Sequence, residues 1–313
     1  MKSEVEGFGG HGRLSRKSDV VLTKSDRNDE HEMKQKTKNR HEFAVYQDTL
    51  TSDLENPPSL GYGVTNKEKS RRSEIRRGIN AMARQDVDGL VLTDQDVIHR
   101  ITRVLRLQEG EQLVLFDRHH NALVELGPIT GKKELITHII AANPNKILKP
   151  HTTFFLPLLK REAFDSALYS LVEVGTNTIQ LVITEKTQRT LTPHELLRAE
   201  RTMISAAEQS KNFAIPLLRA PISFVQCVQL LQKESGLKIF FDPEGIPLIE
   251  QITRAHEQKP DTISLMIGPE GDLTPTEKKQ LQQAGITFCA LTPTILRACQ
   301  AAALSSAIFR SIL

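Results

Sequence analysis

The stretch LMIGPEGDLTPTEKKQL, residues 265–281, changes from apolar to charged at its centre. The apolar run Ile263–Ile267 is long enough for a buried strand and too short for a helix, and it ends at Gly-Pro-Glu-Gly. Thr274 then precedes Pro275, and Glu277 follows the threonine by three positions, which is the pattern of a capped helix start. The stretch therefore predicts a strand, a tight turn and a helix.

In open α/β sheets, ligands bind at such turns, beyond the carboxyl ends of the strands. Gly268 and Gly271 would let a ligand lie directly on backbone N–H and C=O groups. The same glycines also suit a turn that only reverses the chain. Taken alone, the stretch favours neither interpretation.

From residue 151 onward, strand-like and helical patterns alternate. Strand-like runs include HTTFFLPLL (151–159), TIQLVIT (178–184) and KIFFD (238–242), with helical patterns between them. This alternation predicts a mostly parallel sheet with helices on both faces. The sequence has neither a Gly-x-Gly-x-x-Gly motif after the first strand nor a Walker lysine, which disfavours a nucleotide-dependent enzyme of another kind.

The region before it, residues 75–147, reads as a small β-barrel or sandwich. Its first element, DVIHRITRVLRL (96–107), places Val97, Ile98, Ile101, Val104 and Leu105 on one face of a helix. Three strand-like runs separated by turns follow. His99, Arg103 and Arg106 line another face of that helix, with Arg100 beside them. The three arginines would suit RNA phosphates. For any single arginine, a solvated helix face is the simpler explanation.

Two segments outside the folded regions differ from them in composition. Residues 1–74 mix both charges with Ser, Thr and Asn and contain little to bury, so they are expected to be disordered. Their acids nearly balance their bases, which favours a solvated linker over an RNA-binding tail. The segment NPNKILKP (143–150) reads as a linker between the two folded regions.

The composition indicates a soluble, cytoplasmic protein. The net charge is +3, a mild bias that is compatible with a polyanionic partner but is not evidence for one. Three cysteines without metal-ligand spacing indicate a reducing compartment and no metal site. Residues 1–15 lack the apolar core of a signal peptide, and no apolar run approaches the ~20 residues of a membrane span.

Five motifs occur in a fixed order between about residue 75 and the end of the chain. They are HRITRVLRL with the following GEQLVLFD, then VEVG, AAEQS with IP after it, LMIGPEG and LTPTILRACQAAA. In this order they resemble the RsmE family of SPOUT methyltransferases. The resemblance implies an α/β fold, with a PUA-like RNA-binding β-barrel at 75–147 and a trefoil-knotted methyltransferase domain at 151–313.

The resemblance also implies an activity, namely S-adenosylmethionine-dependent methylation of N3 of a uridine in 16S ribosomal RNA. The partner would be that RNA or the small ribosomal subunit, and no metal is needed. A homodimer packed through the knot is implied as well. The last helix contains AAALSSAIF, which is apolar all round and is therefore expected to be buried.

The resemblance places the cofactor between two loops. Its expected contacts are Ile267, Gly268, Pro269, Glu270, Gly271, Leu291, Thr292, Ile295 and Leu296. Arg297 is the candidate catalytic residue, because it would stabilise charge on the uracil when N3 loses its proton. An ion pair between Arg297 and Glu270 is the structural alternative. Lys160 and Arg161 are further candidate RNA contacts.

Several positions depart from the family's pattern. Thr292 replaces a glycine, Thr294 replaces an arginine, and 298–300 (Ala-Cys-Gln) replace Thr-Glu-Thr. Four smaller departures are Ser170, Lys186, Asn212 and Asp272. These changes leave the fold unthreatened but bear on the chemistry. Two hypotheses therefore stand: an active uridine-N3 methyltransferase, and a non-catalytic RNA-binding homologue.

Overall fold

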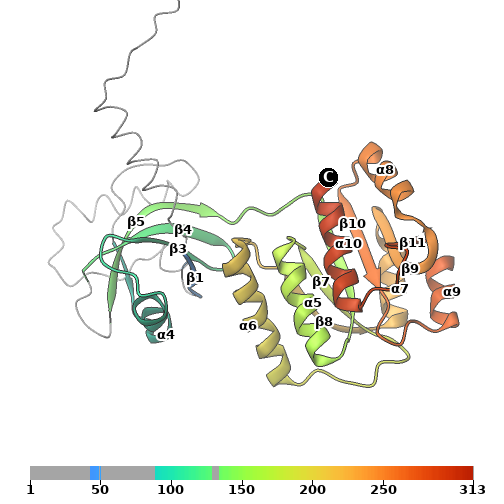
Figure 1. The fold of residues 1–313 in the computed structure, drawn as a ribbon, viewed down its shortest axis with the longest axis horizontal. Coiled ribbons are helices and arrows are strands. Elements are labelled where there is room, and N and C mark those ends of the chain that lie inside the picture. The colour runs from blue at the N-terminus through green and yellow to red at the C-terminus, as the bar shows by residue number, and fades with distance from the viewer. Residues whose placement is uncertain (1–42, 49, 51–88, 129–133, 313) are drawn as a thin grey trace, which may run out of the picture. The chain divides into compact units, whose positions relative to one another are not determined.

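The computed structural model describes residues 43–48, 50, 89–128 and 134–312. Strands in these residues form two separate sheets, one of five strands and one of six (Figure 1). The smaller sheet belongs to the N-terminal part of the described chain, and the larger sheet begins after the linker at 145–150.

The smaller sheet has the strand order β1-β3-β4-β5-β2. Its strands are β1 (Phe43–Tyr46), β2 (Gly89–Leu92), β3 (Gln112–Phe116), β4 (His120–Leu126) and β5 (Leu135–Pro144). The pairs β3–β4, β4–β5 and β2–β5 are antiparallel, whereas β1 runs parallel to β3. Leu90, Leu113, Leu115 and Val124 from these strands are fully buried in one hydrophobic cluster, which gives this sheet its own core.

Strand β1 lies within residues 1–74, which were expected to be largely disordered, and corrects that expectation for Phe43–Tyr46. Phe43–Tyr46 pairs with β3, and Ala44 and Val45 are buried. Four apolar residues are too short a run to stand out in a long polar segment, and their partner strand lies about 70 positions further along the chain. The rest of the prediction for residues 1–74 concerns residues that lie outside the described part of the chain, apart from 47, 48 and 50.

The helix expected at 96–107 is shorter and changes its winding. Helix α4 (Gln95–His99) starts at Asp94, whose side chain accepts the N–H groups of Asp96 and Val97. A π-helical turn, Arg100–Val104, then follows. Its wider turn rotates the later residues, so that Ile101 is buried while Val104 is 62% exposed. The expectation that Val104 lies on the apolar face was wrong.

The larger sheet has the order β11-β9-β10-β6-β7-β8, and all its paired strands are parallel. Its strands are β6 (His151–Pro157), β7 (Thr178–Ile183), β8 (Leu217–Ser223), β9 (Leu237–Pro247), β10 (Thr262–Ile267) and β11 (Thr287–Ala290). The helices between and after them are α5 (Arg161–Glu173), α6 (Pro193–Ser210), α7 (Phe224–Lys233), α8 (Leu248–Gln258), α9 (Pro275–Gln283) and α10 (Ala298–Ile312).

Helices cover both faces of this sheet, as the alternation of elements predicted. Phe154 and Leu156 of β6 belong to a cluster with buried residues of α5, α6, α8 and α10. Phe155 points to the other face, where it shares a cluster with α7 and α9 residues. Successive residues of a strand point to opposite faces, so one apolar run serves both layers.

Two elements of the larger sheet were not predicted. Strand β8 contains Pro221, which argues against a central strand, but β8 lies at the edge of the sheet, where proline is tolerated. Helix α8 follows β9 immediately at Leu248 and has no side-chain cap, so nothing in the sequence announces its start.

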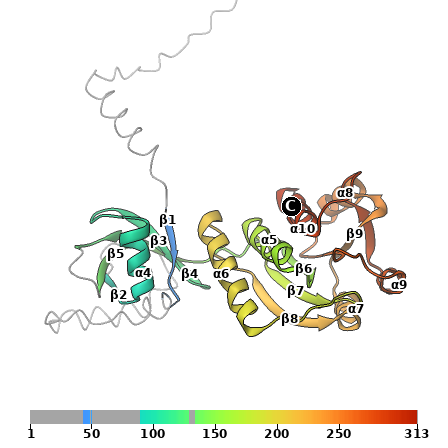
Figure 2. The same cartoon turned by 60° about the horizontal axis from the view of Figure 1, so that its bottom comes forward.

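Buried polar contacts join the two sheets through helix α6. The carboxylate of Glu208, only 6% exposed, accepts the backbone N–H of Tyr46 at 3.0 Å and pairs with the Arg100 guanidinium. Phe116 of β3 packs against Phe213, with ring centroids 4.7 Å apart. Figure 2 shows α6 beside β1 on one side and beside α5 on the other.

A half-buried arginine holds the last helix in place. The Arg310 guanidinium on α10 donates two hydrogen bonds to the Gly175 carbonyl, at 2.7 and 3.0 Å, and one to the Pro150 carbonyl at 2.7 Å. It also binds the side chain of Asn177. Burial lowers the pKa of Arg310. These contacts join the last helix to the start of the sheet.

Candidate functional site at the carboxyl edge of the larger sheet

Parallel strands bring their carboxyl ends to one edge of a sheet. Strand β10 ends at Ile267 and β11 ends at Ala290, and only β9 lies between them. The loops that follow, 268–274 and 291–297, therefore leave the same edge. These are the two loops predicted to hold a cofactor, and open α/β sheets bind ligands at this edge.

The loop after β10 is held from the neighbouring strands. The Glu270 carboxylate accepts the backbone N–H of Lys160, which follows β6, at 2.8 Å. The Lys186 ammonium, which follows β7, donates to the Gly271 carbonyl at 2.6 Å. Contacts from both sides fix the path of the turn without occupying its backbone N–H groups at 270 and 271.

A second set of contacts ties the loop to helix α9. The Lys278 ammonium lies 2.6 Å from a carboxylate oxygen of Asp242 and 2.7 Å from one of Asp272. Burial lowers the pKa of Lys278, but its hydrogen bonds to the two carboxylates outweigh this effect and hold the pKa above its usual value. Lys278 therefore stays charged and joins the middle of β9 to the loop.

The capped start of α9 takes part as well. The predicted capping box is present: Thr274 and Glu277 exchange side-chain and backbone hydrogen bonds. Glu277 is 5% exposed and its carboxylate also accepts the N–H of Glu185 at 2.8 Å. The helix start is therefore bonded to the loop after β7, which makes the turn part of a rigid network.

The two glycines of the turn differ in their surroundings. A Cβ on Gly268 would lie 2.9 Å from a carboxylate oxygen of Asp272, inside the turn itself. A Cβ on Gly271 would meet nothing closer than the Lys186 side chain at 3.5 Å. A side chain at Gly268 would therefore also press on the turn itself, and its contact with a cofactor stays a prediction. Gly271 keeps open space.

The loop after β11 combines a buried start with an exposed end. Leu291 packs against the core cluster that contains Ile267, which links the two loops. The Thr292 hydroxyl donates a hydrogen bond to the Thr294 carbonyl at 2.6 Å. The residue that replaces a glycine therefore stabilises the loop in which it lies. Ile295 is 85% exposed, an unusual value for an isoleucine at the edge of a core.

Arg297 is exposed and immediately precedes α10. Within the described residues no ion pair between Arg297 and Glu270 is found, since Glu270 binds the Lys160 backbone instead. The structural alternative for Arg297 therefore has no support. Its side chain is available to a ligand at this edge.

The structure divides the candidate RNA contacts between the two sheets. Lys160 and Arg161 are exposed beside the loop after β10. Arg103 on the π-helical turn and Arg106 just after it are both exposed. Arg100 instead pairs with the buried Glu208, which gives it a structural role.

Sequence reasoning missed the residues that hold the site together. Asp242, Lys278 and Glu185 come from three elements far apart in the chain, and no local motif links them. An acidic residue directly after the apolar run IFF was the one available signal. The part of the chain that the structure describes contains no group of three or more His, Cys, Asp or Glu side chains placed to hold a metal ion.

Family comparison agrees with this geometry. The family of RNA methyltransferase domains matches residues 147–310, which span the larger sheet and both loops. The chain belongs to this RNA methyltransferase family. A second family, the RNA methyltransferase PUA domain, matches residues 92–140 in the smaller sheet. The predicted α/β fold with a PUA-like part is thereby confirmed, while the knot stays a prediction.

Individual relatives show which RNA methyltransferases this protein resembles in sequence. It is 26% identical over 232 residues to the ribosomal RNA small subunit methyltransferase E of Synechocystis, covering 73% of this chain and 75% of the relative. The enzyme of the same name from Mycobacterium bovis is 26% identical over 232 residues, 70% of this chain and 86% of the relative. The resemblance to the RsmE family is confirmed.

A solved structure shares the fold of this RNA methyltransferase. It is the ribosomal RNA small subunit methyltransferase E of Neisseria gonorrhoeae bound to S-adenosyl methionine, with a TM-score of 0.64 and 22% identity. The match covers 87% of this chain and 98% of that one. Among the helices that the structure describes, none is both long and apolar enough to cross a membrane.

Proposed function

We propose that this RNA methyltransferase transfers a methyl group from S-adenosylmethionine to N3 of a uridine in 16S ribosomal RNA. The observation that carries the proposal is the rigidly held turn 268–274 at the carboxyl edge, inside the matched family domain. The relatives' shared name, ribosomal RNA small subunit methyltransferase E, supports the RNA substrate. The cofactor bound to the Neisseria relative supports the donor.

The residues at this edge fit such a cofactor. Gly271 leaves its backbone open to a ligand, and Ile295 offers an exposed apolar side chain on the facing loop. The cofactor's proposed contacts are Ile267, Gly268, Pro269, Glu270, Gly271, Leu291, Thr292, Ile295 and Leu296. When bound, S-adenosylmethionine supplies a methyl group that its sulfonium already activates.

In the reaction, the protein positions the methyl group and stabilises the charge on the uracil. The two loops orient the methyl group toward the uracil N3, since transfer needs an in-line approach. The Arg297 guanidinium lies at the same edge and stabilises the negative charge that the uracil carries when N3 gives up its proton. Lys160 and Arg161 beside the loop, with Arg103 and Arg106 on the PUA-like part, hold RNA phosphates.

Gly271→Val tests the cofactor site. The added side chain would stand on the open backbone, a clash of about 1–3 kcal/mol, so S-adenosylmethionine should bind at least about tenfold more weakly by calorimetry. The site is on the surface, so the free energy of unfolding should change by less than about 0.5 kcal/mol. Lys279→Ala, an exposed change on α9, should leave cofactor binding unaltered.

The wild-type measurement decides between the two hypotheses for this family member. Binding of S-adenosylmethionine together with methyl transfer to 16S RNA supports the active enzyme. If the wild type binds RNA but no cofactor, the chain is a non-catalytic RNA-binding homologue and the proposed function is wrong. If Gly271→Val binds the cofactor with the same affinity as the wild type, the cofactor does not bind at this turn.

We also propose that the protein is a cytoplasmic homodimer, packed through the region of the last helix. Leu304 on α10 is 38% exposed and Ile295 just before α10 is 85% exposed, although the sequence pattern predicted a buried helix. Apolar side chains left at a surface are typical of an interface. Sedimentation at micromolar concentration should give twice the mass of one chain. A single-chain mass would contradict the dimer.

A further inference from the structure

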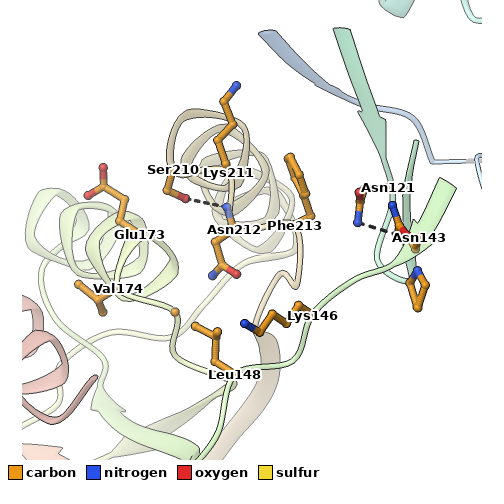
Figure 3. Close-up of a pocket in the computed structure, with 12 residues that line it drawn as sticks. Asn121, Asn143, Lys146, Leu148, Glu173, Val174, Ser210, Lys211, Asn212 and Phe213 are labelled. Carbon is orange, nitrogen blue, oxygen red and sulfur yellow. Dashed lines mark hydrogen bonds between the residues drawn. The ribbon is translucent and has the colours of Figure 1, made fainter. Parts of the chain in front are cut away.

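A cavity of about 460 Å³ lies away from the proposed cofactor loops. It is formed by the linker, by the C-terminal ends of α5 and α6, and by Asn121 and Asn143 of the smaller sheet (Figure 3). Because α5 and α6 end where β7 and β8 begin, the cavity lies at the amino edge of the larger sheet. Its volume is in the range of small-ligand sites.

Amide side chains line this cavity and are held in place. Asn121 donates its amide N–H to the side-chain oxygen of Asn145 at 3.0 Å, and Asn212 donates to the Val172 carbonyl at 2.8 Å. In the described part of the chain, the amide oxygens of Asn121 and Asn212 have no hydrogen-bond partner. Fixed amides with open acceptors suit the donor and acceptor groups on the edge of a nucleobase.

Positive charge gathers at the rim of the cavity. Lys146 of the linker lines the cavity and extends toward the space between the linker and α6 (Figure 3). Lys149 directly follows the lining residue Leu148, and both lysines are exposed. Burial first, and then the cations Lys149, Arg310 and Arg219, lower the pKa of His151, which follows the linker. The acidic groups nearby are Glu173 in the lining and Glu234 near His151.

The inner wall has the opposite polarity. The C-terminal ends of α5 and α6 meet there, and each helix end carries a partial charge of roughly −0.5. A phosphate would be repelled by these ends and attracted by the lysines at the rim. A base, which is neutral and carries N–H donors, suits the inner wall better.

We propose that this cavity binds an unpaired nucleotide of the RNA substrate. Its base lies against the asparagine amides, and the phosphates on either side contact Lys146 and Lys149. The inference rests on the proposed function, which supplies the RNA, and adds a second contact at the edge of the sheet opposite the cofactor loops. Such a contact would let the enzyme recognise RNA structure beyond the target uridine.

The double variant Lys146→Glu/Lys149→Glu tests the rim. Removing two phosphate contacts should weaken binding of a 16S RNA fragment by at least about tenfold at about 0.1 M salt and should flatten its salt dependence. KM for RNA should rise, with kcat and the S-adenosylmethionine affinity unchanged. Asn143→Ala, which removes one exposed amide from the cavity, should weaken RNA binding about threefold without altering the salt dependence.

A charge-matched control is Arg254→Glu/Lys279→Glu, which reverses two exposed cations on α8 and α9. It should bind RNA within about twofold of the wild type. If the rim variant and Asn143→Ala both bind RNA like the wild type, the cavity is not an RNA site, whereas the proposed function stands. If the control variant binds RNA as weakly as the rim variant, the inference is also overturned, because reversing any two exposed charges would then have the same effect. If the wild type neither binds RNA nor transfers methyl groups, both proposals fail.

Discussion

Gly245→Ala is expected to destabilise the protein by about 3 kcal/mol or more. Gly245 lies in β9 against the neighbouring strand β11, where the register shifts between Phe288 and Cys289. A Cβ at Gly245 would come within 2.5 Å of the Cys289 backbone nitrogen and the Phe288 carbonyl carbon. Real Cβ atoms do not approach a backbone so closely, so two paired strands would have to separate. Urea denaturation measures the change.

Gly271→Ala is the matched control for this prediction. It adds the same methyl group to a second glycine of the same domain, where the nearest atom is 3.5 Å away. Its midpoint of urea denaturation should equal that of the wild type. Equal stability of Gly245→Ala and Gly271→Ala would mean that β9 and β11 do not pack as closely as the structure shows.

Arg297→Ala is expected to lower the rate of methyl transfer by about 10²–10³ while S-adenosylmethionine binds as in the wild type. The guanidinium is exposed at the edge where both loops end, and within the described residues no ion pair occupies it. Its charge is thus free for the uracil. Single-turnover transfer to a 16S RNA fragment, with saturating cofactor, measures the chemical step.

Arg297→Lys separates charge from shape. Lysine keeps the positive charge but loses the planar group that can bind two oxygens, so an intermediate rate is expected. Arg254→Ala, at an exposed arginine of α8, should transfer at the wild-type rate. If Arg297→Ala transfers the methyl group at the wild-type rate, Arg297 takes no part in the reaction. Loss of cofactor binding in that variant would assign Arg297 to the cofactor instead.

Local signals in the sequence predicted much of the larger sheet. The predicted capping box at Thr274 is present, with proline at the start of the helix, because this pattern acts within four residues. The strand and turn at 263–271 were predicted for the same reason. Elements without such signals were missed, namely β8 with its proline and α8 without a cap.

Contacts between distant parts of the chain escaped prediction. Arg100 looked like an RNA contact because its helix shows a basic stripe, yet Glu208 lies 108 positions away and binds it. Lys278 connects Asp242 and Asp272 through the fold and not through any motif. The sequence places a residue on a face of its own element, but the partner on that face depends on tertiary packing.

The position of β10 in the sheet bears on how the chain is made. A ribosome releases β6, β7, β8 and β9 before β10, yet β10 is the strand that joins β9 to β6. Until residue 267 has left the ribosome, the nascent domain consists of two separate pieces with open strand edges. Those edges are sites for wrong pairing, and the closing contacts span about 110 residues from β6 to β10. The centre of this domain is therefore built late during synthesis, and the nascent chain depends on its last fifty residues to become a single sheet.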